Sequence, residues 1–157
     1  TVNHTLHGDA GLAIREEQDI VYTEMPDAYR PPKKKPAPQP TAFDMHVPMT
    51  TARLFRYSAA TFNAHRIHYD RPYATEVEKY PGLLVHAPMQ ATLLMGAAVR
   101  HVGRGPDRFT FRGVHPMFDF HDMRLVGVND GDALDLCTVA TDEGHQGLQA
   151  RAEWGVA

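Results

Sequence analysis

Met89–Val102, MQATLLMGAAVRHV, is a run of small and apolar side chains that continues almost all the way round a helix. A helix that is apolar on every face is normally wrapped by other structure. Pro88 stands immediately before the run, where the first turn of a helix tolerates proline. The stretch therefore predicts a helix that is enclosed by the rest of the chain.

The residues after this helix alternate between apolar runs and turn signals. Four strands are predicted, over Arg108–Phe118, Met123–Val128, Ala133–Ala140 and Gly147–Val156. Turns are predicted at Asn129–Asp132 and Asp142–Gly144. We expect these strands to form an antiparallel meander. One apolar helix followed by a run of strands predicts an α+β fold, in which the sheet curls around the helix.

The residues before the helix predict three short elements. Ala42–Val47 is typical of a strand, and Thr50 or Thr51 can cap a helix over Ala52–Ala60. A second short helix is expected over Arg71–Tyr80, which opens with a proline near its first position.

The N-terminal part is different in character. Thr1–His7 and Leu12–Glu24 are predicted strands joined by a turn at Gly8–Gly11. An isolated hairpin is marginal in water, so these strands need another sheet. Pro26–Pro40 holds six of the twelve prolines and the run Lys33–Lys35, a composition that predicts a semi-rigid, solvated linker.

Composition excludes several classes of protein. The net charge of −3 gives no general electrostatic footprint for nucleic acid, and no apolar run approaches the ~20 residues of a membrane span. Cys137 is the only cysteine, which excludes a disulfide framework and a cysteine-based zinc site. No secretory signal is visible, and we expect a cytoplasmic protein (mitochondrial matrix in a eukaryote). The ten histidines point to acid/base or metal chemistry.

Polar groups are concentrated in Phe62–Asp70, FNAHRIHYD. If Asn63–His68 forms a helical turn or two, His65 and His68 can face the same way, and imidazoles suit proton transfer near neutral pH. The stretch Val85–Pro88 precedes the apolar helix. Free N–H groups at a helix start can hold a developing oxyanion.

Four blocks of the sequence resemble a known family. They are Leu54–Ala74 (LFRYSAATFNAHRIHYDRPYA), Pro81–Pro88 (PGLLVHAP), Pro116–Phe120 (PMFDF) and Gly144–Trp154 (GHQGLQARAEW). Together they resemble type 2 3-hydroxyacyl-thioester dehydratases and the related mesaconyl-CoA and itaconyl-CoA hydratases, within the MaoC-like hydratase group. The resemblance covers residues 42–157 and implies a hotdog fold, an antiparallel sheet around one apolar helix.

The resemblance also implies roles for individual residues. The broader group has catalytic aspartate and histidine residues, which fall on Asn63 and His68, and His65 falls on an asparagine. An amide holds a water but cannot take its proton, so proton transfer is expected to rest on His68, with His65 or Asp70 as helpers. Ala87 replaces a glycine before Pro88; its N–H keeps the oxyanion role if its φ is negative.

The implied activity is reversible hydration of an enoyl thioester to a 3-hydroxyacyl thioester by a hydro-lyase without a cofactor or metal. The thioester carbonyl binds near Ala87 and His86, and His68 moves the proton. The substrate is acyl-CoA or an acyl-carrier protein, and a branched dicarboxylic acyl group would need a cation such as Arg66 or Arg71. We expect no nucleic-acid or membrane partner.

The expected domain organisation is half of a double hotdog. Residues 1–25 resemble the terminal hairpin of a mostly absent N-terminal hotdog, residues 26–41 the linker, and residues 42–157 the catalytic hotdog. Because sites in this family lie between two hotdogs, a homo-oligomer is expected.

Two other functions remain open at this point. A non-catalytic hotdog that binds acyl-CoA or serves as a structural subunit is one, because Asn63 and Ala87 depart from the group pattern. A metal-binding protein built on the histidines is the other. His86 could also serve only as a helix cap.

Overall fold

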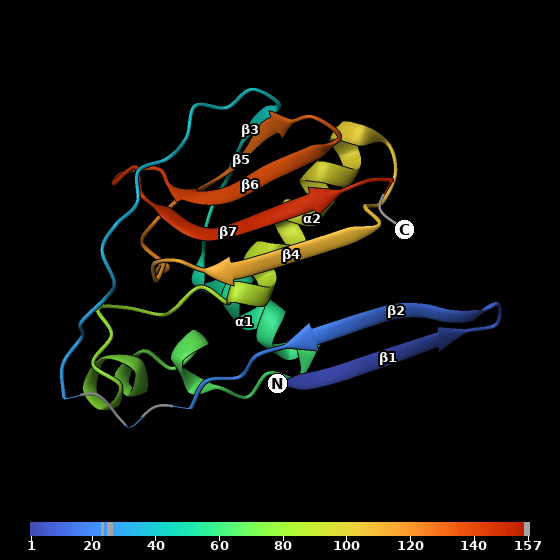
Figure 1. Cartoon of the computed structure of the whole chain (residues 1–157). Coiled ribbons are helices and arrows are strands. Elements are labelled where there is room, and N and C mark those ends of the chain that lie inside the picture. The colour runs from blue at the N-terminus through green and yellow to red at the C-terminus, as the bar shows by residue number, and fades with distance from the viewer. Residues whose placement is uncertain (23, 25–26, 156–157) are drawn as a thin grey trace.

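The computed structural model describes residues 1–22, 24 and 27–155. Its main body is a five-stranded antiparallel sheet with helices on one side (Figure 1). The strands lie in the order β3-β5-β6-β7-β4. Their bounds are β3 Phe43–Val47, β4 Arg108–Gly113, β5 Met123–Asp130, β6 Ala133–Ala140 and β7 Gln146–Glu153.

Helix α2, Ala87–Val102, packs across the sheet as the apolar run predicts. Its buried side chains join the inner face of the sheet in one hydrophobic core. Enclosure is not complete, however. Thr92, Met95 and Arg100 are exposed and mark a second stripe of the helix that faces away from the sheet. The prediction of a helix wrapped on every face is therefore wrong for this stripe.

The expected simple meander is also wrong in one respect. Strands β5, β6 and β7 follow one another as predicted, but β4 pairs with β7 and not with β5, which comes next in the chain. Strand β4 thus forms one edge of the sheet and β3 the other.

Several predicted bounds shift for local reasons. The strand from Arg108 ends at Gly113, because the N–H groups of Val114 and His115 both bond to the carbonyl of Gly147 and Pro116 has no N–H to donate. The last strand ends at Glu153, and Val156 lies outside the described residues.

The helices before α2 differ in how closely they match their predictions. Helix α1, Thr51–Thr61, has Thr50 as its N-cap, which accepts a hydrogen bond from the N–H of Arg53. The second predicted helix is shorter than expected: residues 71–72 are helical and continue into η2, a π-helix over Tyr73–Val77. Lys79, at φ 62°, follows this helix.

The N-terminal strands β1 (Val2–Gly8) and β2 (Gly11–Gln18) form a separate hairpin. It lies beyond β4, without a ladder to the sheet (Figure 1). All its residues are exposed. The second strand is shorter than the predicted Leu12–Glu24, and residue 23 lies outside the described part.

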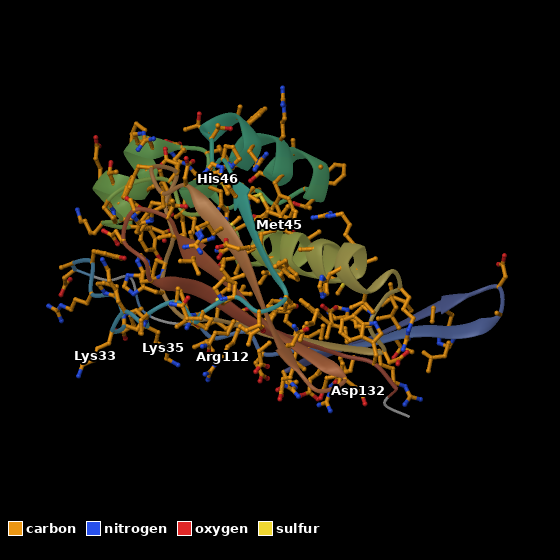
Figure 2. All side chains as sticks on the ribbon, turned by 90° about the horizontal axis from the view of Figure 1, so that it is seen from above. Lys33, Lys35, Met45, His46, Arg112 and Asp132 are labelled. Carbon is orange, nitrogen blue, oxygen red and sulfur yellow. The ribbon has the colours of Figure 1, made fainter. Side chains whose placement is uncertain are left out.

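The linker is not free in solvent along its length. Ala37 donates to the carbonyl of Gly144, and the N–H of Gln146 donates to the carbonyl of Lys35. Lys33, Lys35 and Arg112 lie on the side of the molecule away from α1 (Figure 2). No helix of the described residues is long and apolar enough to span a membrane.

Candidate active site

His68 is held by backbone groups of two segments. It ends the 3-10 turn η1, Arg66–His68, and its Nδ1 lies 2.8 Å from the carbonyl oxygen of Leu84. The N–H of Leu84 in turn donates to the carbonyl of Ile67. A carbonyl only accepts, so Nδ1 carries the proton and Nε2 of neutral His68 keeps a lone pair. Nε2 has no partner among the described residues and is not one of the occluded nitrogens.

The surroundings of His68 favour its neutral form. The residue is only 7% exposed, and burial lowers the pKa of its imidazole. The hydrogen bond to Leu84 and the carboxylate of Glu78 act in the opposite direction, and His65 adds to the lowering. A neutral imidazole with an open Nε2 is a proton acceptor near neutral pH.

His86 is completely buried and lies flat against His68. The two rings are 3.6 Å apart between centroids and inclined by 17°. Its Nε2 lies 2.8 Å from the hydroxyl of Ser58, and the ring of Tyr57 is 4.8 Å away. Burial and the neighbouring His68 lower the pKa of His86 to about 4. His86 is the N-cap residue of α2, but its side chain makes no capping hydrogen bond within the described residues, so it does not serve only as a helix cap.

Asn63 follows the end of α1, where Phe62 at φ 53° turns the chain out of the helix. The side-chain oxygen of Asn63 accepts a hydrogen bond of 3.0 Å from the N–H of His65. Residues 63–65 are not helical, so the expected helical turn over Asn63–His68 is present only as η1.

His65 therefore does not share a helical face with His68. The two rings are perpendicular and their centroids are 5.7 Å apart. Nε2 of His65 lies 3.0 Å from Glu78, and the His65 side chain is exposed. His65 thus contacts His68 edge-on from an exposed position, where it is paired with Glu78.

Ala87 begins α2 directly after the buried His86. Its N–H donates to no acceptor among the described residues, as expected at the first turn of a helix. Positive φ values occur at only two non-glycine positions of the described chain, Phe62 and Lys79. Ala87 therefore does not need the conformation of a glycine, and its N–H is available to an anionic oxygen.

The charged residues around η1 are paired within the chain. Arg66 donates from Nε and Nη2 to Asp70, at 2.9 and 2.7 Å, and lies over the ring of Tyr73. Arg71 pairs with Asp119. The hydrogen bond from Arg66 lowers the pKa of the Asp70 carboxyl, so Asp70 is a carboxylate held by Arg66 and not a proton donor.

A hollow of about 320 Å³ lies beside these residues. It is lined by Asn63 and Ser58 together with the apolar side chains of Phe55, Phe62 and Tyr69. The site thus combines a buried imidazole stack, an amide and a mainly apolar depression.

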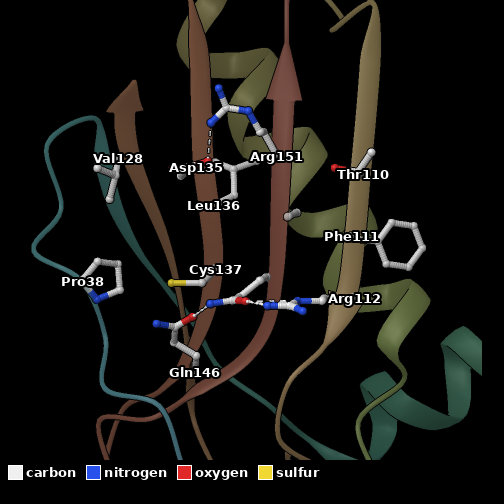
Figure 3. A pocket seen from close by; sticks show the side chains of 12 residues that line it. Pro38, Thr110, Phe111, Arg112, Val128, Asp135, Leu136, Cys137, Gln146 and Arg151 are labelled. Carbon is white, nitrogen blue, oxygen red and sulfur yellow. Dashed lines mark hydrogen bonds and ion pairs between the residues drawn. The ribbon is translucent and has the colours of Figure 1, made fainter. Parts of the chain in front are cut away.

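A larger hollow of about 530 Å³ lies elsewhere, on the outer face of the sheet against Pro38 of the linker (Figure 3). Its polar side chains pair with one another, Arg112 with Gln149 and Arg151 with Asp135. Burial raises the pKa of Cys137 to about 12, so this thiol is not a nucleophile. We therefore place the candidate site at the smaller hollow, which is lined by Asn63 and by Ser58, the hydrogen-bond partner of His86.

Comparison with known sequences shows the family of this chain. The family model described as hydroxyacyl-thioester dehydratase type 2 matches residues 1–119. The chain belongs to this family. It is 44% identical to a mesaconyl-C(4)-CoA hydratase of Chloroflexus aurantiacus over 162 residues, which covers 99% of the chain and 55% of that protein. It is 30% identical over 117 residues to the mitochondrial hydroxyacyl-thioester dehydratase type 2 of Schizosaccharomyces pombe, covering 73% of the chain and 39% of that protein.

Structural comparison confirms the fold of this family member. A MaoC-like dehydratase from Phytophthora capsici superposes with a TM-score of 0.68 at 12% identity, covering 96% of the chain and 54% of that structure. The sheet around α2 is therefore the hotdog fold that the sequence blocks imply. The chain spans about half the length of the curated relatives it matches.

Two side chains of the candidate site, Ser58 and Glu78, are not among those predicted from the sequence. Ser58 lies one helical turn after Leu54 on the buried stripe of α1, and a hydroxyl in an otherwise buried stripe is a usable signal. Glu78 is thirteen residues from His65, and no local pattern joins the two. No group of three or more His, Cys, Asp or Glu side chains in the described ranges is arranged to hold a metal ion.

Proposed function

We propose that this chain carries the catalytic residues for reversible hydration of an enoyl thioester to a 3-hydroxyacyl thioester. The observation that carries the proposal is the juxtaposition of His68 and the start of α2. His68 presents an open Nε2, and its ring stacks on His86, the residue immediately before the free N–H of Ala87. A proton acceptor beside an oxyanion donor is what addition of water to a conjugated thioester requires.

In the proposed reaction the thioester carbonyl accepts a hydrogen bond from the N–H of Ala87. This polarises the conjugated double bond and leaves its β-carbon electron-poor. Nε2 of His68 takes a proton from a water as the water oxygen bonds to the β-carbon. The proton then goes to the α-carbon, and dehydration is the reverse sequence. The amide of Asn63 holds the water, because an amide offers donors and an acceptor but takes no proton.

The acyl group is the finer part of the proposal. The relative from Chloroflexus aurantiacus is named for mesaconyl-CoA, which supports a short branched dicarboxylic acyl-CoA. A distal carboxylate needs a cation, and two arginines stand close to His68 in the sequence: Arg66 begins η1, and Arg71 lies three residues after its end. Both are paired with aspartates and about half exposed, so a substrate carboxylate would compete with Asp70 or Asp119.

We also propose that residues 1–25, 26–41 and 42–157 are a hairpin of a neighbouring hotdog, a linker and the catalytic hotdog. The exposed apolar side chains of Leu6 and Ile14 on the hairpin and the greater length of the relatives support this division. A site completed by a second hotdog implies an oligomer, and a cytoplasmic location remains part of the proposal.

The test is hydration of a panel of crotonyl-, mesaconyl- and itaconyl-CoA. The loss of ultraviolet absorbance of the conjugated thioester measures the rate. The parent chain is expected to turn over at least one thioester. His68→Ala is expected to lower kcat about a hundred- to ten-thousandfold, the usual contribution of a general base. A folded parent without turnover on any thioester, or a fully active His68→Ala, contradicts the proposal and favours a non-catalytic acyl-CoA-binding hotdog.

A further inference from the structure

The imidazole of His86 is unusual for a residue of the core. It has no exposed surface, yet its Nδ1 finds no partner in the described chain and is occluded from water. Its Nε2 is taken by the hydroxyl of Ser58 at 2.8 Å. A buried polar atom without a partner destabilises a fold, whereas a phenyl ring would fill much the same volume without that loss. Packing alone therefore does not account for an imidazole here.

The position of the ring points to what it contacts. One face of His86 lies flat against His68 with 3.6 Å between the ring centroids, and the tilted ring of Tyr57 lies 4.8 Å from His86. The hydrogen bond of His68 to Leu84 fixes the direction of Nδ1. That bond alone leaves the tilt of the ring free, and a flat contact with a second ring removes this freedom.

We propose that Ser58 and His86 are positioning residues. The Ser58 hydroxyl holds the buried ring of His86, and that ring sets the plane of the His68 ring and shields it from water. The proposal rests on the proposed function of His68. It assigns to both residues an action through His68 and not on the substrate.

The charges around the stack fit this role. The rings next to His68 are those of His65, which is paired with Glu78, and of His86, which contacts the ring of Tyr57. When His68 takes a proton it becomes a cation. A protonated His86 at 3.6 Å would oppose that step, whereas burial keeps His86 neutral at working pH. A neutral ring also covers one face of His68 from water, which keeps His68 unprotonated before the reaction.

Four variants of the full chain test the proposal: Ser58→Ala, His86→Phe, His86→Ala and the double variant Ser58→Ala/His86→Phe. We expect Ser58→Ala to lower kcat about ten- to a hundredfold with a KM changed less than about twofold, because misplacement of a catalytic group acts on the chemical step. Because Ser58 acts only through His86, adding Ser58→Ala to His86→Phe is expected to have no further effect. Thr61→Ala is the matched control, since it removes a hydroxyl from the same helix that bonds only to the carbonyl of Tyr57.

A second measurement is independent of turnover. The titration of His68 is followed by NMR of its ring protons, assigned with His68→Ala, in every variant that keeps the circular dichroism spectrum of the parent. His86→Ala opens one face of His68 to water and is expected to raise its pKa towards about 6.5, the ordinary value for histidine. His86→Phe keeps the face covered and is expected to retain the lowered pKa.

The outcomes are distinguishable. If no thioester is turned over but His86→Ala raises the pKa of His68 and His86→Phe does not, the proposed function fails and the positioning role stands. If the parent is active and neither the kinetics of Ser58→Ala nor the titration of His68 in His86→Ala changes, the positioning role is overturned and the proposed function stands. Additive effects of Ser58→Ala and His86→Phe on kcat also overturn the positioning role.

Discussion

At the scale of single residues, the identities of the candidate catalytic side chains can be predicted from the sequence, but the contacts that hold them cannot. His68 and Asn63 follow from the sequence, because they stand in a block that resembles a known signature. The stacking of His68 on His86 and the bond to Ser58 do not follow from it. They join segments 18 and 28 residues apart in the chain, and only the tertiary structure brings η1, α1 and the start of α2 together.

The oxyanion role of Ala87 gives a prediction at this scale. Ala87→Pro removes the N–H while keeping a residue that the first turn of a helix accepts, and His86 at φ −58° and ψ 128° is compatible with a following proline. We expect kcat for hydration of an enoyl-CoA to fall about a hundredfold or more, the usual effect of one lost oxyanion donor. Steady-state kinetics measure this.

The control is Ala87→Gly, which keeps the N–H and restores the glycine usual at this position in the family. Its kcat should stay within about threefold of the parent. Equal loss in both variants, or full activity in Ala87→Pro, would show that this N–H does not bind the carbonyl.

At the scale of elements, the sequence predicts what depends on local pattern. The apolar run over Met89–Val102 and the turns at Asn129–Asp132 and Asp142–Gly144 place α2 and the β5–β6–β7 ladder correctly. The pairing of β4 with β7 was missed, because a ladder between distant strands depends on how the whole sheet closes and leaves no mark in the local sequence. The exposed stripe of α2 was missed because small apolar residues occur on both of its faces.

Close packing between β7 and the segment before β5 gives a prediction at the element scale. A Cβ on Gly147 would overlap the side chain of Met117 and lie 3.0 Å from Oε1 of Gln90. Met117 has no exposed surface and little room to move. We expect Gly147→Ala to lower the free energy of unfolding by about 1–3 kcal/mol, as overpacked cores do.

Urea unfolding followed by circular dichroism measures this, with Gly113→Ala as the matched control. Gly113 is the last residue of the neighbouring strand β4, has no positive φ and would place its Cβ in open space. We expect the control to stay within about 0.5 kcal/mol of the parent. A neutral Gly147→Ala would show that Met117 repacks without loss.

At the scale of the whole molecule, the linker contacts the sheet next to two buried histidines, His115 and His145. His115 contacts the carbonyl of Pro32 through Nδ1 at 2.9 Å, and Lys34 pairs with Glu143 at 2.5 Å. Glu143 also lies 3.1 Å from Nδ1 of His145, whose ring is 98% shielded and edge-on to His115. The contact with Glu143 lacks hydrogen-bond geometry, so neither nitrogen of His145 has a hydrogen-bond partner in the described part of the chain. The linker and the sheet are thus joined at a site where burial favours the neutral form of the His145 imidazole.

This junction predicts how stability depends on pH. Burial lowers the pKa of His145, and the positive charges of His115, Lys34 and His121 lower it further against the opposing carboxylate of Glu143. A group whose pKa is lower in the folded chain takes up protons on unfolding. Its contribution is therefore complete above about pH 6.5 and is lost as pH falls towards the folded pKa. His68, His86 and His121 also have lowered pKa values and act in the same direction, whereas Glu143 loses its pairing only in more acidic solution, below its ordinary pKa.

We therefore expect the free energy of unfolding to decrease from pH 7 to pH 5. His145→Gln is expected to reduce this slope by about 1 kcal/mol per pH unit, because each proton taken up on unfolding contributes up to about 1.4 kcal/mol per pH unit. Urea unfolding at pH 7, 6 and 5 measures the slope. His7→Gln on the exposed hairpin is the control, because its ring is in water in the folded and unfolded chain alike. A slope in His145→Gln equal to that of the parent would mean that the buried ring accepts its proton without loss. The stability of the linker junction would then rest on its other contacts, which include the Lys34–Glu143 pair and the hydrogen bonds to the carbonyls of Pro32, Lys35 and Pro36.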